Sequence, residues 1–400
     1  MKAEFKSDLD RDSAGHSADL QQLELDGLYR KERILNARQG VEIEIDGNRL
    51  INFCSNDYLG LANHPRIARA MQDAAVEFGT GSSASPLVSG KTVLHRSLEE
   101  KLADVTKRDR VLLMSCGYMA NLAIVAGLVS SRNQWIFEDR LCHASMVDAA
   151  RLSGARLKRY THASPASLEG LLGAAQRDLK LVLTESVFSM DGDLAPLHEL
   201  SGLCRKHRAC LVVDDAHGFG VLGNNGLGGL DHFSLDQSAV PLLMATFGKA
   251  LGTYGAFIAG PAALIETLVQ RARTYIYTTS LPAPLAAAAH EALKVHEDEP
   301  ERRDHLASRI RRFRSGVRQL GIKTTSAETP IQPVIIGDSK KTQLASRMLE
   351  QNGLFISAIR PPTVPRNSSR LRITLSAGHT DEQIDRLLDG LNKCIAIGLI

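Results

Sequence analysis

The chain has 400 residues, of which 44% are hydrophobic and 23% are charged. These fractions are those of an ordinary globular protein and exclude disordered, collagen-like and coiled-coil chains. Lys and Arg number 48 and Asp and Glu 45, so the formal net charge is only +3, and aromatic residues make up 5%. Proteins that bind nucleic acids usually have a strongly basic face or stacking aromatic side chains. We therefore expect no nucleic-acid partner, and we expect a chain of this length to form two or more domains.

Neither the cysteines nor the apolar segments are typical of a secreted or membrane protein. The six cysteines are scattered, with no Cys-x-x-Cys pair and no matching histidine cluster, so neither a disulfide framework nor a zinc site is expected. The N-terminal residues mix both charge signs and lack the apolar segment of a signal peptide. No run approaches the roughly 18 apolar residues of a membrane helix. These features predict a soluble cytoplasmic protein with reduced cysteines.

The N-terminal part, residues 1–55, is predicted to contain a helix and a hairpin. About 17 polar residues form a tail. Leucine and isoleucine then recur at mostly helical spacing from Asp19 to Ala37, which predicts an amphipathic helix despite Gly27. The sequence VEIEIDGNRLINF alternates around Asp46 and Gly47, a pattern that predicts a β-hairpin.

Strand and helix patterns alternate over residues 56–290, which we predict to be a large domain. The predicted strands are Val111–Met114, Trp135–Glu138, Leu157–Tyr160, Leu181–Glu185, Ala209–Asp214, Pro241–Thr246 and Ala256–Ala259. Helical periodicity lies between most of them, as in Ala144–Leu152, Ser167–Ala175 and Leu197–Lys206. Such alternation indicates an α/β fold with a mostly parallel sheet and helices on both faces. In that fold, ligands bind at the carboxyl ends of the strands.

The remaining residues, 291–400, are predicted to form a smaller α+β domain. It begins with a long charged helix from about Glu291 to Gln319. The apolar stripe of this helix consists of Leu306, Ile310, Phe313 and Val317. Because these residues recur every three or four positions, the arginines lie on the opposite face, and the basic run predicts a solvated amphipathic helix.

A formal GxGxxG motif, Gly218, Gly220 and Gly223, follows the strand LVVDD. In dinucleotide-binding enzymes this loop opens a helix whose N-terminus binds the pyrophosphate. The sequence GNNGLGGLDHF that follows has no helical periodicity, which argues against a dinucleotide-dependent oxidoreductase. Walker A, HExxH and GxSxG motifs are absent as well.

A lysine follows the apolar strand in MATFGKALG, which places Thr246 and Lys249 on a turn of small residues. A lysine that is held in place and partly desolvated has a lowered pKa, and its neutral amine can form a Schiff base. On this motif alone, a surface lysine in a loop is the simpler interpretation.

Acidic side chains follow the neighbouring strand, in LVVDDAHGFG, where Asp214, Asp215 and His217 come directly after an apolar run. Burying an acid is costly unless a cation or hydrogen-bond donors face it. In a pyridoxal-phosphate enzyme, Asp214 would pair with the protonated ring nitrogen and His217 could reach the phenolic oxygen. A structural ion pair is the alternative. A metal site would lack a second histidine nearby, so no metal is expected.

Three further segments complete a candidate cofactor site. SCGYMAN begins a helix after a strand, so the backbone amides of Gly117 and Tyr118 can face a phosphate, although an ordinary helix start has the same pattern. His143 follows the strand WIFED, where a flat imidazole could stack on a pyridine ring. TESVFSMDGD adds Glu185 and the hydroxyl of Ser189. Each of these residues has an ordinary structural explanation when taken alone.

In this order, NDYLGL, SCGYMAN, HAS, TESVFSMDGD, DDAHGFG and TFGKALG resemble the α-oxoamine synthases, from about residue 20 to the C-terminus. These are pyridoxal-phosphate enzymes of the aspartate-aminotransferase fold (fold type I). The resemblance implies that Lys249 binds the cofactor covalently, that Asp214 pairs with the ring nitrogen and that His143 stacks on the ring and contacts substrate. The further cofactor contacts that it implies are Gly117, Tyr118, Ser189, His217 and Thr246.

Within the family, AIRPPTVPRNSSRLRITLSAGHT and HASMVDAARLSGARLKRY are similar to the biotin-pathway branch. That branch condenses L-alanine with a pimeloyl thioester of CoA or acyl-carrier protein and releases CO2. The resemblance implies that Arg30 and Thr363 bind substrate, and that Arg360 and Arg372 are candidates for the substrate carboxylate. It also implies a homodimer with shared active sites. A sister synthase that joins glycine or serine to another acyl-CoA would need the same residues.

One loop departs from the family pattern. GTGSSASPLVSG stands where GSGGSR is commoner, so Ala84 and Pro86 replace a flexible glycine and a polar or basic residue. Pro86 removes an amide donor and stiffens the loop. The resemblance therefore does not extend to contacts between this loop and the acyl chain or a phosphate.

Overall fold

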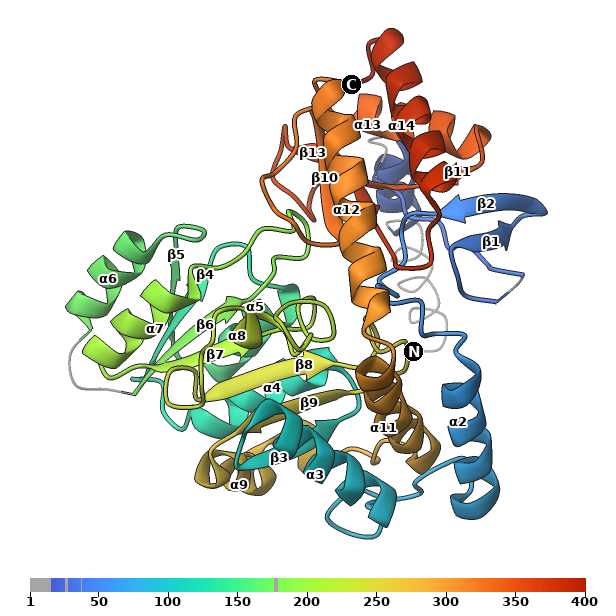
Figure 1. The fold of residues 1–400 in the computed structure, drawn as a ribbon. Helices are drawn as coiled ribbons and strands as arrows, with labels where there is room; N and C mark the ends of the chain where they lie inside the picture. The colour runs from blue at the N-terminus through green and yellow to red at the C-terminus, as the bar shows by residue number, and fades with distance from the viewer. Residues whose placement is uncertain (1–15, 26–27, 37, 176–178) are drawn as a thin grey trace, which may run out of the picture.

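A seven-stranded mixed sheet forms the centre of the computed structural model, which describes residues 16–25, 28–36, 38–175 and 179–400 (Figure 1). The strand order is β3-β9-β8-β7-β6-β4-β5. The strands are β3 Arg110–Met114, β4 Trp135–Asp139, β5 Arg156–Tyr160, β6 Lys180–Glu185, β7 Cys210–Asp214, β8 Leu242–Thr246 and β9 Ala256–Gly260. Only β9 runs antiparallel to its neighbours. The predicted α/β fold class and all seven predicted strands are confirmed.

Helices cover both faces of this sheet, which explains why the strands, apart from the edge strand β5, are mainly apolar. In β7, Leu211 and Val213 belong to one hydrophobic cluster, whereas Val212 belongs to the other. The helices α4 Gly117–Leu128, α5 Ala144–Ser153 and α9 Ala262–Arg271 cover the Val212 face. The opposite face packs against α3 Val93–Thr106, α6 Pro165–Ala174, α7 Leu197–Lys206 and α11 Ala283–Asp298.

Two small sheets lie beside the large one. The predicted hairpin is confirmed as β1 Glu42–Ile45 and β2 Asn48–Asn52, with Asp46 and Gly47 both at positive φ in the turn. The short strand β11 Leu354–Phe355 extends it by pairing with β2. The second sheet has the order β10-β13-β12. Its strands are β10 Ile331–Gly337, β12 Ser357–Ile359 and β13 Ser369–Thr374, and the helices around it are α12 Glu301–Gln319, α13 Ser339–Gln351 and α14 Asp381–Ala396.

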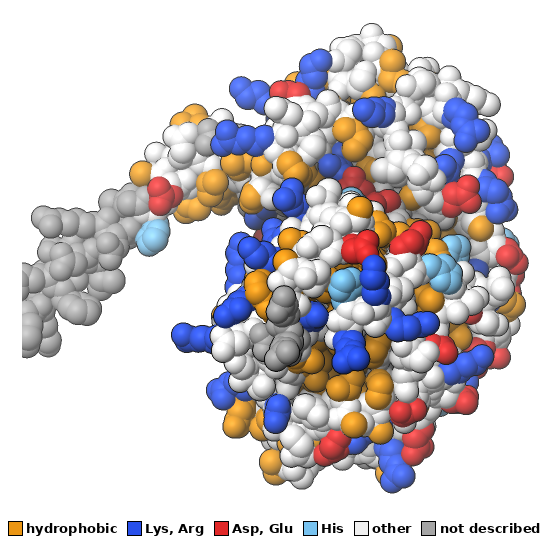
Figure 2. Space-filling model, turned by 90° about the vertical axis from the view of Figure 1, so that its left-hand side faces the viewer, with side chains coloured by type: hydrophobic (Ala, Val, Ile, Leu, Met, Phe, Trp, Pro, Cys, Tyr) orange, Lys and Arg blue, Asp and Glu red, His pale blue; other side chains and the backbone are white. Residues whose placement is uncertain are grey.

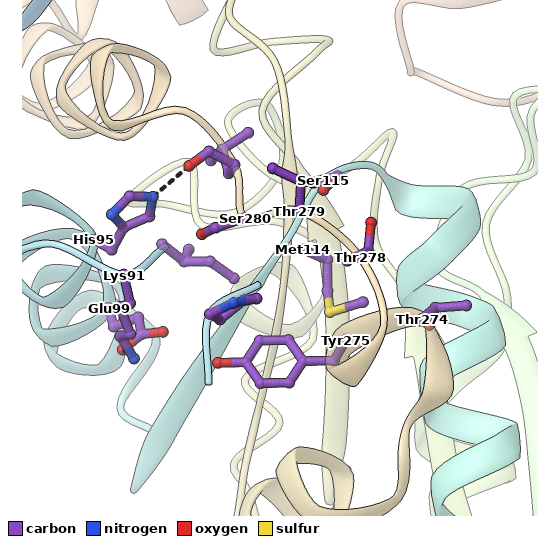
Figure 3. Close-up of a pocket in the computed structure, with 13 residues that line it drawn as sticks. Lys91, His95, Glu99, Met114, Ser115, Thr274, Tyr275, Thr278, Thr279 and Ser280 are labelled. Atoms are coloured by element: carbon purple, nitrogen blue, oxygen red, sulfur yellow. Dashed lines mark hydrogen bonds and ion pairs between the residues drawn. The ribbon is translucent and has the colours of Figure 1, made fainter. Parts of the chain in front are cut away.

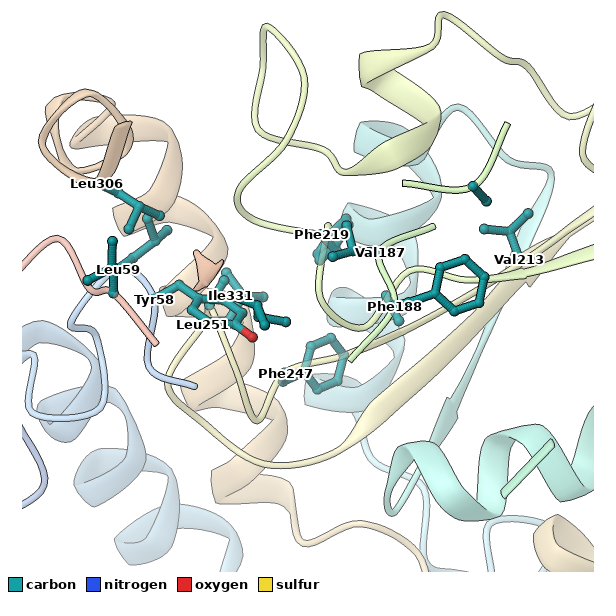
Figure 4. Packing of buried hydrophobic residues seen from close by; sticks show 14 of the residues in the cluster. Tyr58, Leu59, Val187, Phe188, Val213, Phe219, Phe247, Leu251, Leu306 and Ile331 are labelled. Atoms are coloured by element: carbon teal, nitrogen blue, oxygen red, sulfur yellow. The ribbon is translucent and has the colours of Figure 1, made fainter. Parts of the chain in front are cut away.

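The core continues from the large sheet into the C-terminal part. Figure 4 shows Leu306 of α12 beside Leu59 and Tyr58, with Ile331 and Leu251 bridging toward Phe247. The four stripe residues of α12 are all buried, as predicted from their spacing. One hydrophobic cluster contains residues from all three predicted parts. The domain boundaries near residues 55 and 290 therefore stay predictions.

Two helix predictions were wrong in extent. Within the described residues, the N-terminal helix covers residues 16–25 and residues 28–34 are not helical, while Gly27 and Ala37 lie outside the described residues. Leu35 instead forms a bridge with Ile45 of the hairpin, so this apolar residue pairs with another segment and does not lie on a helix face. The predicted helix from Glu291 to Gln319 is two helices, α11 and α12, because Pro300 between them cannot continue the backbone ladder.

Candidate functional site

Several predicted site residues meet at one edge of the large sheet, because parallel strands end there together. Asp214 is the last residue of β7 and is paired in register with Glu185, the last residue of β6. Thr246 ends β8, and Lys249 follows on the next turn. Lys249 interacts electrostatically with both acids, and His143 with Asp214 and Lys249. The structure thus brings the three residues predicted as catalytic, Lys249, Asp214 and His143, into one site.

The neutral form of the Lys249 amine is accessible near physiological pH. Burial and the nearby charge of Arg372 together lower the pKa of Lys249 from 10.5 to about 8, against the opposing charges of Asp214 and Glu185. Thr246 shapes the turn that carries the lysine, since its hydroxyl donates to the Gly255 carbonyl (2.8 Å) and accepts from the Gly248 amide (3.2 Å). A lysine in this state is a competent nucleophile and base.

The side chain of Asp214 is buried and accepts hydrogen bonds from two N–H groups. It is 5% exposed; its Oδ2 accepts from Asn121 Nδ2 at 2.8 Å and its Oδ1 from the Ala216 amide at 3.0 Å. These donors and Lys249 offset the cost of burying the charge. Such an acid can hold a protonated ring nitrogen of a bound ligand.

The adjacent Asp215 has a structural role. It accepts from the Ser186 hydroxyl and from the Gly229 amide (2.8 Å) and so ties the glycine loop to β6, and burial raises its pKa to about 7. Gly223 of the formal GxGxxG motif lies in a turn at positive φ. The next helix, α8 Gly229–His232, has four residues and begins six residues later, so this loop does not open the long helix of a dinucleotide site.

The N-termini of α4 and α5 both face this edge. α4 begins at Gly117 and has no side-chain cap, which leaves the amides of Gly117 and Tyr118 available to an anion. The Tyr118 hydroxyl donates to Asp148, and its ring meets the His143 ring edge-on at 6.5 Å. His143 caps α5 through Nδ1, while burial lowers its pKa and keeps the ring neutral.

A second network holds His217 and Arg372. His217 Nδ1 lies 2.5 Å from the Tyr58 hydroxyl, and burial holds its pKa well below its ordinary value. Tyr58 contacts Asn56 (3.2 Å), which accepts from the Arg372 guanidinium at 3.2 and 3.3 Å. Arg372 Nε also donates to the Ser189 carbonyl at 2.7 Å. This network places the predicted residues Ser189, His217 and Arg372 together, next to Lys249.

The other predicted substrate residues form a separate group. Arg30 and Arg360 lie close enough that the charge of Arg30, added to burial, lowers the pKa of Arg360; Arg347 of α13 contributes in the same way. Thr363 is exposed, and its amide donates to the Arg360 carbonyl at 3.0 Å. The small sheet connects this group to the network around Arg372. Strand β12, which ends just before Arg360, pairs with β13, the strand that contains Arg372.

Three residues of the site, Asn56, Tyr58 and Asn121, were not predicted from the sequence, and Glu185 was named without a role. Each lies in a motif that was singled out. Glu185 is buried, accepts from the amides of His143 and Ser189, and burial raises its pKa well above the ordinary value. The motifs could have signalled these residues, but not their partners.

A hydroxyl-lined pocket borders the N-terminus of α4. Figure 3 shows Ser115, Thr278, Thr279 and Ser280 around it, with His95 and Lys91 at its far side. The loop with Ala84 and Pro86 adjoins this pocket. The Ala84 carbonyl accepts from the Ser280 amide (2.9 Å), and Pro86 occupies the second position of a turn closed by Val88 and Ser85 (3.1 Å). Because that position of a turn favours proline, the missing amide costs no hydrogen bond.

A charged histidine, His162, links two segments next to the site. His162 Nδ1 contacts Asp139 at 2.9 Å and Nε2 contacts Asp193 at 2.7 Å. Burial opposes its charge, but the hydrogen bonds to both carboxylates raise the pKa of His162 to about 10 from 6.5. The contact ties the end of β4 to the segment that carries Ser189.

We expect His162→Ala to lower the free energy of unfolding by about 2 kcal/mol, since it leaves Asp139 buried without its cation. The folded pKa of His162 is raised, so its stabilisation is complete below about pH 6.5 and is lost as the pH rises toward 10. Urea unfolding of both proteins at pH 6.5 and pH 10 measures this. A difference that stays constant or grows with pH contradicts the charged clamp.

Comparisons with known proteins agree with this arrangement. The aminotransferase class I and II family model matches residues 48–391. An 8-amino-7-oxononanoate synthase of Thioalkalivibrio sulfidiphilus is 53% identical over 377 residues, 94% of this chain and 96% of that protein. The one from Methylococcus capsulatus is 52% identical over 367 residues, 92% of this chain and 95% of that protein.

Two solved structures are similar over most of their length. A serine palmitoyltransferase from S. paucimobilis with a bound PLP–myriocin aldimine has a TM-score of 0.91 and 29% identity, covering 96% of this chain and 98% of that chain. An 8-amino-7-oxononanoate synthase from Francisella tularensis has a TM-score of 0.77 and 30% identity, covering 88% and 99%.

Proposed function

Because this chain belongs to the aminotransferase class I and II family, we propose that it is a pyridoxal-phosphate-dependent 8-amino-7-oxononanoate synthase. It condenses L-alanine with a pimeloyl thioester, of CoA or acyl-carrier protein, and releases CO2 and the free thiol. The observation that carries the proposal is the placement of Lys249, Asp214 and His143 at one sheet edge, in a chain 53% identical to a synthase of this kind over nearly its whole length.

The residues at this edge fit the cofactor. The uncapped N-terminus of α4, at Gly117 and Tyr118, suits its phosphate, and the buried Asp214 suits its ring nitrogen. His143 is partly exposed and its ring is able to stack, while Ser189 and His217 suit the phenolic oxygen. When bound, pyridoxal phosphate supplies an electron sink that stabilises negative charge on the amino-acid Cα.

Lys249 moves the protons of the reaction. Its neutral amine, available because its pKa is about 8, removes the Cα proton of alanine. The Cα then forms a bond to the thioester carbonyl carbon, and the carbon–sulfur bond breaks with the electron pair leaving on the thiolate. Loss of the alanine carboxyl as CO2 follows, and Lys249 returns a proton to the same carbon. Arg372, a buried cation beside Lys249, binds the alanine carboxylate before it is lost.

Arg30 and Arg360 bind the distal carboxylate of the pimeloyl chain. Burial and the charge of Arg30 lower the pKa of Arg360, so a bound anion relieves the repulsion between the two guanidinium groups. We expect Arg30→Met and Arg360→Met each to raise KM for the pimeloyl thioester roughly 10- to 100-fold with a smaller change in kcat. Heptanoyl thioester, which lacks the carboxylate, is the control substrate. An equal loss with both thioesters would contradict this role.

The enzyme works as a homodimer with shared active sites. The hydrophobic side chains that support this are Leu87, Val88 and Tyr277, which are 50%, 80% and 72% exposed. Their loops are neighbours, because the Ala84 carbonyl accepts from the Ser280 amide. Figure 2 shows the segment 16–25 reaching away from the body with hydrophobic side chains uncovered. Apolar patches of this kind mark interfaces. Light scattering tests this, and an active monomer would contradict it.

We place this enzyme in the cytoplasm, with no nucleic-acid or membrane partner. All six cysteines are free thiols, as in a reducing compartment. Within the described ranges, no helix combines the length and apolar character needed to cross a bilayer.

A panel of amino acids against acyl thioesters tests the function, with thiol release as the signal. We expect L-alanine with pimeloyl thioester to give the highest kcat/KM. A sister synthase is the second candidate, favoured by the TM-score of 0.91 to serine palmitoyltransferase. Preference for serine or glycine with a long acyl chain would replace the first proposal by the second.

A further inference from the structure

Two buried side chains with no role so far connect Asp214 to His143. Asn121 of α4 and Ser145 of α5 are 2% and 0% exposed. Asn121 Nδ2 lies 2.8 Å from Asp214 Oδ2 and 2.8 Å from Ser145 Oγ. Ser145 Oγ in turn lies 2.8 Å from His143 Nδ1. The ring-nitrogen partner and the stacking imidazole are therefore linked through two side chains.

The donor count fixes the direction of these hydrogen bonds. The Asn121 amide has two N–H groups and gives one to Asp214 and one to Ser145. Because Ser145 Oγ accepts from Asn121, its own hydrogen is free to point at His143 Nδ1. The Ser145 backbone amide donates to the same nitrogen at 3.2 Å. Nδ1 is thus surrounded by donors and carries no proton, so the proton of neutral His143 is on Nε2.

The same network supplies both oxygens of Asp214 with hydrogen-bond donors. Both of its oxygens accept, one from Asn121 and one from the Ala216 amide. Asn121 Oδ1 is buried and has no hydrogen-bond partner within the described structure. The polar contribution of this side chain is therefore its two N–H groups, and turning the amide over would place its oxygen against the carboxylate.

We propose that Asn121 and Ser145 are positioning residues that fix the orientation of the Asp214 carboxyl group and hold His143 as the neutral tautomer with the proton on Nε2. The effect on turnover rests on the proposed function, but the tautomer does not. The charged groups that face His143 are Asp214, Lys249 and Asp148, and the hydrogen bonds to Nδ1 of its ring come from Ser145.

Substitutions of Ser145 distinguish the effect of its hydroxyl group from the effect of side-chain size. Ser145→Ala removes the link to His143 but leaves the Asn121–Asp214 bond. Ser145→Thr and Ser145→Val have the same shape as each other, and only threonine keeps the hydroxyl. We expect the alanine and valine variants to lower kcat roughly tenfold, threonine to exceed valine by the same factor, and cofactor affinity to stay within about twofold.

The tautomer is read directly by ¹⁵N NMR of histidine-labelled holoenzyme, with His143→Asn assigning the signal. We expect an unprotonated Nδ1 and a protonated Nε2 in the parent protein from pH 6 to 8, and tautomer exchange or protonation within that range in Ser145→Ala. A protonated Nδ1 in the parent, or an unchanged His143 signal in Ser145→Ala, overturns the proposal even if the enzyme is active.

The Asp214 side is tested by Asn121→Leu, which keeps approximate bulk and removes both N–H groups. We expect the visible absorbance of bound cofactor to titrate at a shifted pH, and kcat to fall roughly 100-fold. Unchanged absorbance and kcat would exclude a positioning role for Asn121. If Asn121→Leu does not fold, Asn121→Asp replaces it, with activity expected only at acidic pH, where the new carboxyl group is protonated and can donate to Asp214; activity independent of pH would contradict the role.

Discussion

Lys249→Ala should lower turnover by more than roughly 10⁴-fold, because it removes both the covalent attachment of the cofactor and the base that takes the Cα proton. Borohydride reduction of the parent holoenzyme should fix the cofactor on the peptide that contains Lys249, and the variant should remain unlabelled. Lys206→Ala, an exposed lysine paired with Glu169, is the matched control and should keep full activity.

The same lysine gives a pH dependence. Since the pKa of Lys249 is about 8, cofactor capture by the apoprotein should accelerate as the pH rises through about 8, where the amine becomes neutral. Partial rescue of Lys249→Ala by added small amines should follow the amine's own pKa. Retained turnover in the variant, or a capture rate that rises only near the ordinary lysine pKa of 10.5, contradicts the assignment.

Asp214→Asn should bind the cofactor but lose about 10³-fold in kcat. The neutral amide cannot hold a proton on the ring nitrogen, so the ring no longer accepts the negative charge of the Cα. Steady-state kinetics and the cofactor absorbance measure the two effects separately.

The neighbouring Asp215→Asn is the control. Asp215 is equally buried but bonds to Ser186 and Gly229, so its substitution should lower stability and leave kcat within about tenfold. A near-normal rate in Asp214→Asn, or equal losses in both variants, would remove the special role of Asp214.

The central sheet could be predicted because burial on both faces imposes its own sequence pattern. Six of the seven predicted strands are apolar runs, the edge strand β5 being polar, and the polar residues at the strand ends, Asp214 and Lys249, met at one edge as parallel strands require. The two helix errors have local causes. Leu35 is apolar because it pairs with Ile45, and Pro300 breaks a charged segment whose periodicity otherwise continues.

The partners within the site could not be predicted, because they depend on which side chains meet across the fold. Asn121 is 93 residues from Asp214 and 24 from Ser145, and no local pattern encodes these distances. Tyr58 reaches His217 across 159 residues in the same way. Arg347 joins Arg30 and Arg360 only through the orientation of α13, which a sequence period alone does not give.

The reaction itself is tested most directly with L-alanine labelled with ¹³C at the carboxyl carbon. Incubated with the holoenzyme and pimeloyl thioester, the label should leave entirely as ¹³CO2, one equivalent per free thiol. The product should have the mass of unlabelled 8-amino-7-oxononanoate. Retention of the label in the product, or thiol release without labelled CO2, would contradict a decarboxylative condensation.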